Sequence, residues 1–478
     1  MTPPPWPTGA APLLVHGARA VLVVPGTPLE HEFSLGSSRQ SGFESPLEPA
    51  GDVHCAGGVV QPAPPAGSTG LGTGSGVELL DAQGCVVTPG LVNAHHHLLQ
   101  TAFRTLPGTR GVPMSQWLPT MAAAYTRAGV DAELVGAAAL AGLAESLLCG
   151  VTTVAEHHLT WPSGGGDGVD LARATAAAAA ALGARLVFVR GAARDEPQAA
   201  AASADAVAQA LVGHAPQGIS PDGMLQVAVG PAGVHSDSAE TFALLGEVAR
   251  RRRLRRRTQA NEQVDVEIAA QRYGRRPLDL LDEWGWLARD VTLAHLCDIT
   301  PDEVRRLAAE GISATHAPGC DLPMGWGVAP MAALLDAGVT VGLGTSGGGS
   351  NDAGHVLADA RLALQVARLA PFGARPLTAR EVLAMATTGS ARGLGRPELG
   401  HLAPGAAADL CVWDTDGVGD AGVADPVAGL VWAQPGRRPR HVVVAGRVVV
   451  RDYRLVAVAG AAAGPDLRAL LARRSPRS

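Results

Sequence analysis

Apolar residues recur along most of the chain in short runs that alternate with longer helical patterns. After Pro89, each short run rich in β-branched residues is followed by a segment whose apolar positions recur every three or four residues. Repeated strand–helix units over about 300 residues are typical of eight parallel strands closed into a barrel. The predicted strands are residues 87–91, 151–154, 184–190, 225–229, 254–260, 291–295, 312–316 and 339–342, and helices are predicted at 131–149, 239–253, 265–273, 301–310 and 352–370.

The two ends of the chain have a different pattern. Residues 1–88 and 397–478 contain short apolar runs separated by turns, without the regular helices between them. We therefore expect an α/β fold, a (β/α)₈ TIM-type barrel over residues 89–396 with a small β-sandwich-like domain built from both termini. A doubly wound open sheet is the main alternative, but no G-x-G-x-x-G motif opens a helix here. Residues 36–76, rich in Gly, Pro and Ser, predict a disordered insertion in the N-terminal part.

Composition excludes several classes of function. A net charge of −6 gives no reason to expect nucleic acid as a partner, and no apolar stretch is long enough to cross a membrane. The N-terminus lacks the pattern of a secretory signal, so we expect a cytoplasmic protein. Six scattered cysteines without a C-x-x-C pair predict neither a disulfide framework nor a structural zinc site. All 38 residues counted as Lys or Arg are arginine, which excludes Schiff-base lysine chemistry, a P-loop lysine and a carboxylated lysine bridging two metals.

Polar and titratable residues follow the predicted strands where each strand ends. His95 and His97 lie two residues apart at the end of the first barrel strand, so their side chains point to the same side. Neutral imidazole is a common ligand of divalent metals, although three adjacent histidines also occur in solvated loops. The carboxyl ends of barrel strands converge on one face, so we expect the strand-end residues to form one site. These residues are His95, His97, Glu156, His157, His158, Gln259, Glu262, His295, His316 and Ser346.

Several segments resemble the amidohydrolase superfamily. They are residues 87–97, 294–316 and 341–352, the tail G-H-L-A-P-G at 400–405 with Ala408-Asp409-Leu410, and residues 425–431 and 444–450. Together they resemble most closely the branch of cyclic deaminases and triazine hydrolases that includes 8-oxoguanine deaminases and hydroxyatrazine hydrolases. The similarity runs over nearly all of residues 77–455.

The resemblance implies a hydrolase that uses a single Zn²⁺ or Fe²⁺ and an activated water to release ammonia or an amine from a heterocyclic ring. It places metal ligands at His95 and His97, a general acid/base at Glu262, and a histidine that polarises the substrate or assists the water at His295. His158, His316 and Gln100 match positions around the substrate pocket. Enzymes of this class often form homo-oligomers, and the implied partner is a small heterocyclic substrate.

Two positions depart from the family pattern. The metal-binding histidine expected three residues before Glu262 is Gln259, and the aspartate expected in V-G-L-G-x-D-G is Ser346. Catalytic zinc normally needs three protein ligands plus an open position, and a neutral serine cannot hold and deprotonate the water as a carboxylate does. The sequence therefore predicts a weakened metal site that is occupied weakly or not at all, unless His158, His235, His316, Cys297 or Asp352 takes over as a ligand. For Asp352, the preceding Ser350 and Asn351 favour a cap of the following helix over a role as ligand.

Three further features have alternative interpretations. Gln100 either faces the substrate ring or lies at the surface. Trp117 either stacks on a planar heterocycle or belongs to the core. The run of arginines at 250–257, broken only by Leu254, enters a predicted barrel strand, which indicates either an anionic substrate or an altered register of that strand.

Three functions remain open on this basis. The first is a diverged enzyme that acts on a C–N bond of a purine- or triazine-like ring through Glu262 and His295, by hydrolysis or by another reaction. The second is a conventional metal-dependent aminohydrolase of the 8-oxoguanine type with substituted ligands. The third is a catalytically silent binding subunit.

Overall fold

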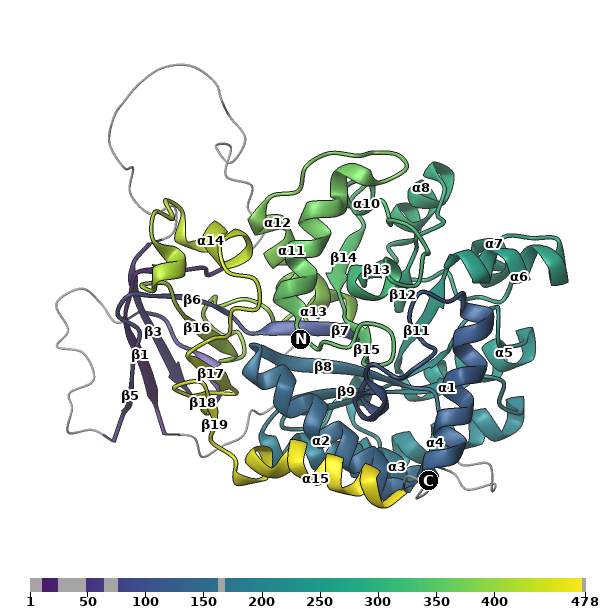
Figure 1. The fold of residues 1–478 in the computed structure, drawn as a ribbon, viewed down its shortest axis with the longest axis horizontal. Helices are drawn as coiled ribbons and strands as arrows, with labels where there is room; N and C mark the ends of the chain where they lie inside the picture. Colours follow the sequence, from purple (N-terminus) through teal and green to yellow (C-terminus); the bar gives the residue numbers. More distant parts are fainter. Residues whose placement is uncertain (1–10, 25–48, 64–75, 162–167, 475–478) are drawn as a thin grey trace.

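The computed structural model describes residues 11–24, 49–63, 76–161 and 168–474, and its largest element is a closed parallel barrel (Figure 1). The strands follow one another around the barrel in chain order, and this confirms the predicted TIM-type fold. The last strand is interrupted: β14 (Thr340–Leu343) pairs with β13, and β15 (Ser346–Gly347) pairs with β7, which closes the ring. The other strands are β7 (Leu91–His97), β8 (Val151–His158), β9 (Arg185–Ala192), β10 (Leu225–Pro231), β11 (Arg255–Ala260), β12 (Val291–His295) and β13 (Ser313–His316).

Helices surround the barrel and begin where the sequence provides caps. Asp131, Ser238 and Thr300 each accept a hydrogen bond from a backbone N–H in the first turn of a following helix. The outer helices are α2 (Ala132–Leu148), α3 (Val169–Leu182), α4 (Pro197–Val212), α5 (Ala239–Arg252), α6 (Gln263–Tyr273), α7 (Pro277–Glu283), α8 (Pro301–Glu310), α10 (Met331–Asp336), α11 (Val356–Val366) and α12 (Ala379–Ala384). Asp352 does not cap α11: His355 is the cap, and the Asp352 carboxylate binds Thr105 N–H and Arg110.

Strands from both ends of the chain form a smaller domain beside the barrel, as expected (Figure 1). One sheet has the order β4-β3-β1-β5 and the other the order β19-β18-β17-β16-β6-β2. They share an apolar core to which Leu13, Leu80, Val87, Leu410 and Val443 contribute. The strands are β1 (Leu13–Ala18), β2 (Ala20–Val21), β3 (Gly51–Ala56), β4 (Val59–Val60), β5 (Glu78–Asp81), β6 (Cys85–Pro89), β16 (Leu410–Asp414), β17 (His441–Val444), β18 (Arg447–Arg451) and β19 (Arg454–Leu455).

The expectation of a disordered insertion over residues 36–76 is wrong for its central part. β3 and β4 form a hairpin there, and β3 pairs antiparallel with β1. The physical reason is an alternation that the Gly and Pro content concealed: Val53, Cys55 and Val60 are buried while their neighbours are more exposed. Residues 36–48 and 64–75 lie outside the described part of the chain.

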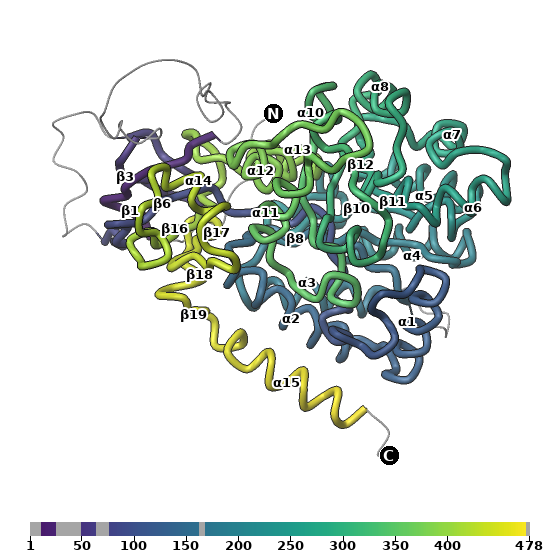
Figure 2. The backbone as a smooth tube through the Cα atoms, turned by 45° about the horizontal axis from the view of Figure 1, so that its top comes forward, coloured from purple at the N-terminus to yellow at the C-terminus, as the bar shows by residue number. Residues whose placement is uncertain are grey.

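The last helix, α15 (Val458–Arg474), was not predicted. It leaves the small domain after β19 and runs along α2 on the outside of the barrel (Figure 2). Arg474 at its end donates hydrogen bonds to Asp131 and Glu133 at the start of α2.

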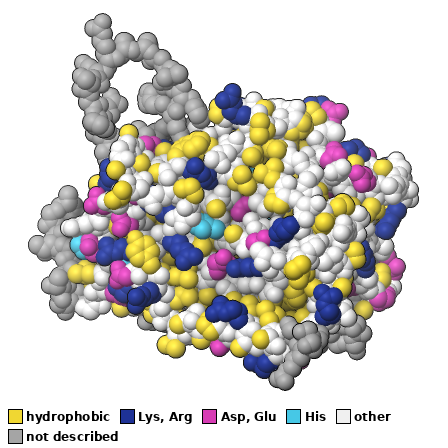
Figure 3. Space-filling view, viewed as in Figure 1, with side chains coloured by type: hydrophobic (Ala, Val, Ile, Leu, Met, Phe, Trp, Pro, Cys, Tyr) yellow, Lys and Arg dark blue, Asp and Glu magenta, His cyan; other side chains and the backbone are white. Residues whose placement is uncertain are grey.

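Across the described residues, no helix combines the length and the hydropathy needed to cross a bilayer. Acidic and basic side chains are interspersed with apolar ones over the face drawn in Figure 3.

Candidate active site

The ends of three barrel strands are held in left-handed backbone conformations by residues other than glycine. Asn261 follows β11 with φ 53°, His295 ends β12 with φ 75°, and Ser346 begins β15 with φ 53°. Such conformations are unfavourable for residues with a Cβ and are concentrated at functional sites. Gly344, between β14 and β15, is required for a different reason: a Cβ there would lie 2.7 Å from His95 Cβ. The last strand can therefore approach His95 closely.

A cavity of about 190 Å³ opens at this face of the barrel. One wall is apolar and aromatic, and it includes Trp117, Met121, Tyr125, Met324 and Trp326. Polar groups also line the cavity, namely His97, Gln100, Glu156, His157, His158, Arg194, His235, Gln259, Cys320, Ser346 and Ser350. An apolar cavity of roughly 150 Å³ holds benzene. This cavity has room for a somewhat larger flat molecule, such as a fused two-ring heterocycle.

Three imidazole rings from β7 and β8 lie against one another at the floor of the site. The ring centroid of His95 is 4.9 Å from that of His97 and 5.8 Å from that of His157. His97 Nδ1–H donates to the His157 carbonyl (2.7 Å), which leaves the Nε2 lone pair of His97 free. Both ring nitrogens of His95 are buried without a hydrogen-bond partner. Burial, reinforced by neighbouring positive charges, holds the pKa of His95 and of His157 well below the usual range, so both rings are neutral.

His295 is held between two acceptors. Its Nδ1–H donates to Asp321 Oδ1 (2.6 Å), and its Nε2–H donates to Gln259 Oε1 (3.1 Å), while Glu262 Oε1 lies 3.7 Å from Nε2. Because both ring nitrogens face acceptors, the arrangement favours the doubly protonated, cationic ring. Burial alone would lower the pKa of His295, but the charge and hydrogen bond of Asp321 outweigh it, and the net direction is upward. Burial likewise raises the pKa of Asp321, but His295 outweighs it and brings that pKa to about 2.

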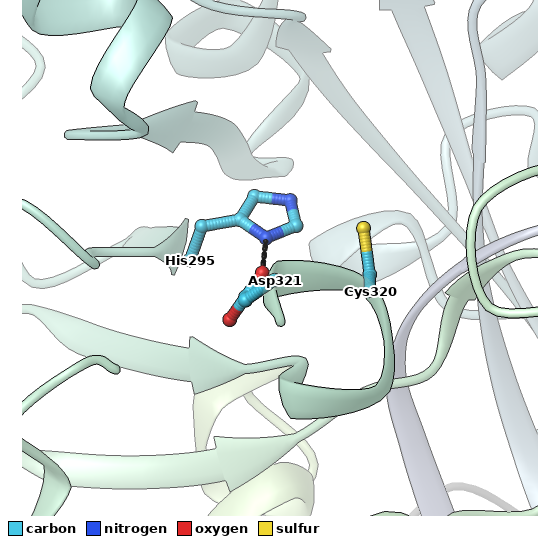
Figure 4. A group of neighbouring side chains, drawn as sticks. All are labelled: His295, Cys320 and Asp321. Atoms are coloured by element: carbon cyan, nitrogen blue, oxygen red, sulfur yellow. Dashed lines mark hydrogen bonds and ion pairs between the residues drawn. The ribbon is translucent and has the colours of Figure 1, made fainter. Parts of the chain in front are cut away.

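Asp321 belongs to the short helix α9 (Pro318–Asp321), together with Cys320 (Figure 4). The figure shows the Asp321 carboxylate beneath Nδ1 of His295 and the Cys320 sulfur beside the ring. Burial is the main cause that raises the pKa of the Cys320 thiol far above its usual value, so the thiol is protonated. Sequence reasoning missed Asp321 because it lies at the end of the four-residue helix α9, several residues beyond β13, and no strand-end pattern points to it.

Glu262 is the other carboxyl group in this cluster. It is completely buried, and neither of its oxygens has a hydrogen-bond partner. Burial raises its pKa, and the positive charges of His295 and His235 only partly offset that effect. A carboxyl group in this state binds a proton more readily than a surface glutamate, which suits a group that takes up and releases protons.

The arginine run divides between the two sides of β11. Arg256 points outward, where it pairs with Asp290 and covers the ring of Trp286. Arg257 lies two residues before Gln259 and on the same side of the strand, so its side chain enters the barrel. The register of β11 is regular, with Arg256 opposite Val291 and Ala260 opposite His295, so the alternative of an altered register is wrong.

The residues predicted from sequence fall into two groups. His97, Gln100, Trp117, His158, Gln259 and Ser346 line the cavity. His95, Glu262 and His295 are not among the lining residues; they are buried in the barrel core, and His295 bonds to the lining residue Gln259. His316 is also absent from the lining, and its Nδ1 lies 3.5 Å from Asp321 Oδ2.

Gln100 and Trp117 occupy the cavity wall through contacts with the same residue. Gly349 N–H donates to Gln100 Oε1 (3.0 Å), and Trp117 Nε1–H donates to the Gly349 carbonyl (3.2 Å). The interpretation of Gln100 as a surface residue is therefore wrong, because its side chain belongs to the cavity wall. Trp117 is shielded from bulk solvent, as a core residue would be, and its side chain also lines the cavity.

The donors around His95 and His97 do not fit a tetrahedral metal site. The two imidazoles offer free lone pairs, but Gln259 and Ser346 contribute only a neutral amide and a neutral hydroxyl. Within the described part of the chain, the one cluster of three His, Cys, Asp or Glu donors close enough to share an ion is His295, Cys320 and Asp321. That cluster includes neither His95 nor His97, and its closest pair is already joined by the 2.6 Å hydrogen bond.

Comparisons with known proteins agree on one family. A sequence profile of the amidohydrolase family matches residues 86–449. The 8-oxoguanine deaminase of Pseudomonas aeruginosa is 35% identical over 433 residues, covering 88% of this chain and 91% of that protein. An isoxanthopterin deaminase from an unknown prokaryote is 31% identical over 79% of this chain and 83% of its own length. The crystal structure of atrazine chlorohydrolase from Arthrobacter aurescens TC1 complexed with zinc superposes with a TM-score of 0.83 at 32% identity, covering 96% of this chain and 100% of that one.

Proposed function

Because the chain belongs to the amidohydrolase family, we propose that it is an enzyme that cleaves a C–N bond of a planar nitrogen heterocycle, with Glu262 and His295 as its proton-transfer groups. The observation that carries this proposal is a buried Glu262 carboxyl that lacks a hydrogen-bond partner and lies 3.7 Å from His295 Nε2, which in turn bonds to Gln259 in the lining of a cavity suited to a flat ring. Relatives named as deaminases of 8-oxoguanine and isoxanthopterin, and a similar structure named as an atrazine chlorohydrolase, act on rings of this kind.

The cavity walls support a flat, purine-like substrate. Trp117, Tyr125 and Trp326 provide aromatic surface on one side, where a planar ring can stack or pack edge to face. On the polar side, Arg194 and His235 are available to bind ring substituents. The Asp265 carboxylate holds His235 Nδ1 at 3.1 Å and, with the charge of Glu262, raises its pKa against the effect of burial.

The proton chemistry follows from the hydrogen bonds of His295. Asp321 fixes the ring and keeps it cationic, so that Nε2–H acts as a hydrogen-bond donor toward the cavity. In the structure this N–H is occupied by Gln259 Oε1. We infer that a bound substrate displaces the Gln259 amide and accepts this hydrogen bond. Glu262 takes a proton from a water whose oxygen bonds to the ring carbon, and it passes that proton to the nitrogen that departs as the C–N bond breaks. His95 and His97 are expected to orient the substrate or water rather than to complete a metal site.

Zinc accompanies related enzymes, and His95 and His97 are the residues that would contact such an ion here. We propose that any zinc or iron binds weakly, because two neutral imidazoles without a carboxylate are an incomplete ligand set. Loss of residues that merely support the ligands typically costs about 10–100-fold in affinity, and loss of the ligands themselves costs more. No step of the proposed chemistry depends on the ion.

The purified full-length protein tests this proposal with a panel of 8-oxoguanine, isoxanthopterin, 5′-methylthioadenosine and atrazine, with ammonia or amine release as the readout. We expect turnover of at least one ring, and a fall in kcat of about 100-fold or more in Glu262→Gln. Glu267→Gln, an exposed position on the adjacent helix α6, is the matched control and should keep full activity. Unchanged turnover in Glu262→Gln, or tight binding of a ring without any turnover, would refute the assignment and favour a silent binding subunit.

A further inference from the structure

Arg257 is a buried cation inside the barrel, on the same side of β11 as the cavity-lining residue Gln259. Only 2% of its surface is exposed, and both terminal nitrogens, Nη1 and Nη2, lack a hydrogen-bond partner. Its backbone is enclosed as well, because a Cβ on Gly230 of the neighbouring strand β10 would lie 1.7 Å from the Arg257 carbonyl oxygen. The side chain therefore has little freedom to move out of the barrel.

Most buried arginines of this chain have partners, which makes Arg257 distinctive. Arg185 is completely buried and forms a two-nitrogen ion pair with Asp409, with N–O distances of 2.6 and 2.9 Å. Arg380 and Arg396 are also buried, and each binds a carboxylate. No described carboxylate forms an ion pair with Arg257, and burial, reinforced by the positive charge of Arg255, lowers the pKa of Arg257 to about 9. A buried charge without compensation is costly, so such an arrangement is rare unless it has a function.

The charge of Arg257 acts on the histidines at the floor of the cavity. Arg257 lies two residues before Gln259 on the barrel-facing side of β11, and its positive charge is one of those that lower the pKa of His95 and of His157. His95 is one of the two imidazoles between which related enzymes would hold a metal. A divalent ion at that position would meet a fixed positive charge of like sign in a medium of low polarity, where repulsion is stronger than in water.

We propose that Arg257 is a built-in cation that excludes a divalent metal from the position between His95 and His97. This inference rests on the proposed function, since it concerns the same pocket, and it assigns the metal-poor character to a residue that is not a ligand position. A guanidinium offers positive charge and hydrogen-bond donors but no coordination position for water. The barrel thus retains the buried positive charge of Arg257, but it lacks a bound metal ion that could activate water.

Zinc affinity in designed variants of the full chain tests the proposal without reference to turnover. The Gln259→His/Ser346→Asp variant restores the two missing ligands, and adding Arg257→Gln to it removes the buried charge. We expect zinc to bind the triple variant at least about tenfold more tightly than the double variant, measured by chelator competition and by elemental analysis after dialysis. Arg256→Gln in the same double background removes a neighbouring arginine charge that points outward and pairs with Asp290, and it should leave the affinity within about threefold of the double variant.

The same variants also show whether a change in zinc affinity is caused by misfolding. Circular dichroism and the unfolding midpoint identify any variant that fails to fold, and for such a variant Arg257→Met provides a second neutral replacement of similar length. Equal zinc affinity in the double and triple variants would overturn the proposal, as would stoichiometric zinc in the unmodified protein. Either result leaves the role of Glu262 intact, because that role is judged by ammonia release in Glu262→Gln.

Discussion

Replacement of Asp321 by asparagine tests the hydrogen bond that organises the site. The carboxylate is fully buried and lies 2.6 Å from His295 Nδ1, and Asn is close to the protonated acid in shape but carries no charge. The folded protein lowers the pKa of Asp321 from 3.8 to about 2. One pKa unit corresponds to about 1.4 kcal/mol, so the ionised carboxylate contributes about 2 kcal/mol to the free energy of unfolding at neutral pH.

The sign of the pH dependence follows from the direction of the shift. A carboxyl whose pKa is depressed by folding stabilises the protein above its unfolded pKa and loses that contribution as the pH falls through its folded pKa. Asp321→Asn should therefore be less stable than the unmodified protein by about 2 kcal/mol at pH 7, and the gap should shrink to about 1 kcal/mol by pH 3. Urea unfolding at a series of pH values, followed by circular dichroism, measures both quantities.

A second aspartate in contact with helix α9 provides the control. Asp359 accepts a hydrogen bond from Gly319 N–H (2.7 Å), but burial raises its pKa to about 7. Its ionisation is unfavourable in the folded state, so Asp359→Asn should not lower the stability at pH 7 or above. A gap between Asp321→Asn and the unmodified protein that is absent at pH 7, or that stays constant from pH 7 to pH 3, would refute the reasoning about the His295–Asp321 pair.

Three further predictions address the cavity, the barrel closure and the C-terminal helix. Trp117→Ala removes an aromatic side chain from the cavity wall, and stacking on such a ring is worth about 0.5–1.5 kcal/mol beyond the area buried. Steady-state kinetics should therefore show a KM raised by about tenfold and a smaller change in kcat. An unchanged KM would mean that the substrate does not contact Trp117. Gly344→Ala introduces a Cβ 2.7 Å from His95 Cβ and should cost about 1–3 kcal/mol in urea unfolding, whereas Gly338→Ala, with open space around it, reports only the strain of its positive φ. Asp131→Ala removes both the cap of α2 and a partner of Arg474, and should lower the stability by about 1 kcal/mol; no change would show that this end of α15 adds nothing.

The barrel was predictable from the sequence because its signals are local. The strands are short buried runs followed by helices, several of which begin at a capping side chain, and the strand ends carry the histidines and Glu262. The hairpin of β3 and β4 was missed because it contains few apolar residues. Its stability comes from the pairing of β3 with β1, which a local pattern does not show. Helix α15 was missed because Pro465 lies inside it and its apolar residues form no clear stripe, so its position depends on contact with α2.

The candidate site was predictable in outline but not in its charges. Strand-end position identified His95, His97, Gln259 and His295, yet it could not show that Asp321, from a turn beyond β13, would hold His295. The burial of Arg257 also depends on the fold: runs of arginine are usually solvated, and only the alternation that places Arg257 on the same side of β11 as Gln259 hints at it. Both features arise from residues brought together by the closed barrel.

The central claim is that this enzyme works with Glu262 and His295 and without a tightly bound metal. Its most direct test is elemental analysis of the purified, catalytically active full-length protein, with turnover of the best ring of the panel measured on the same sample before and after exhaustive chelation. We expect zinc and iron contents well below one equivalent per chain and turnover that chelation leaves unchanged. One equivalent of metal per chain, with activity that disappears on its removal and returns on its addition, would contradict it.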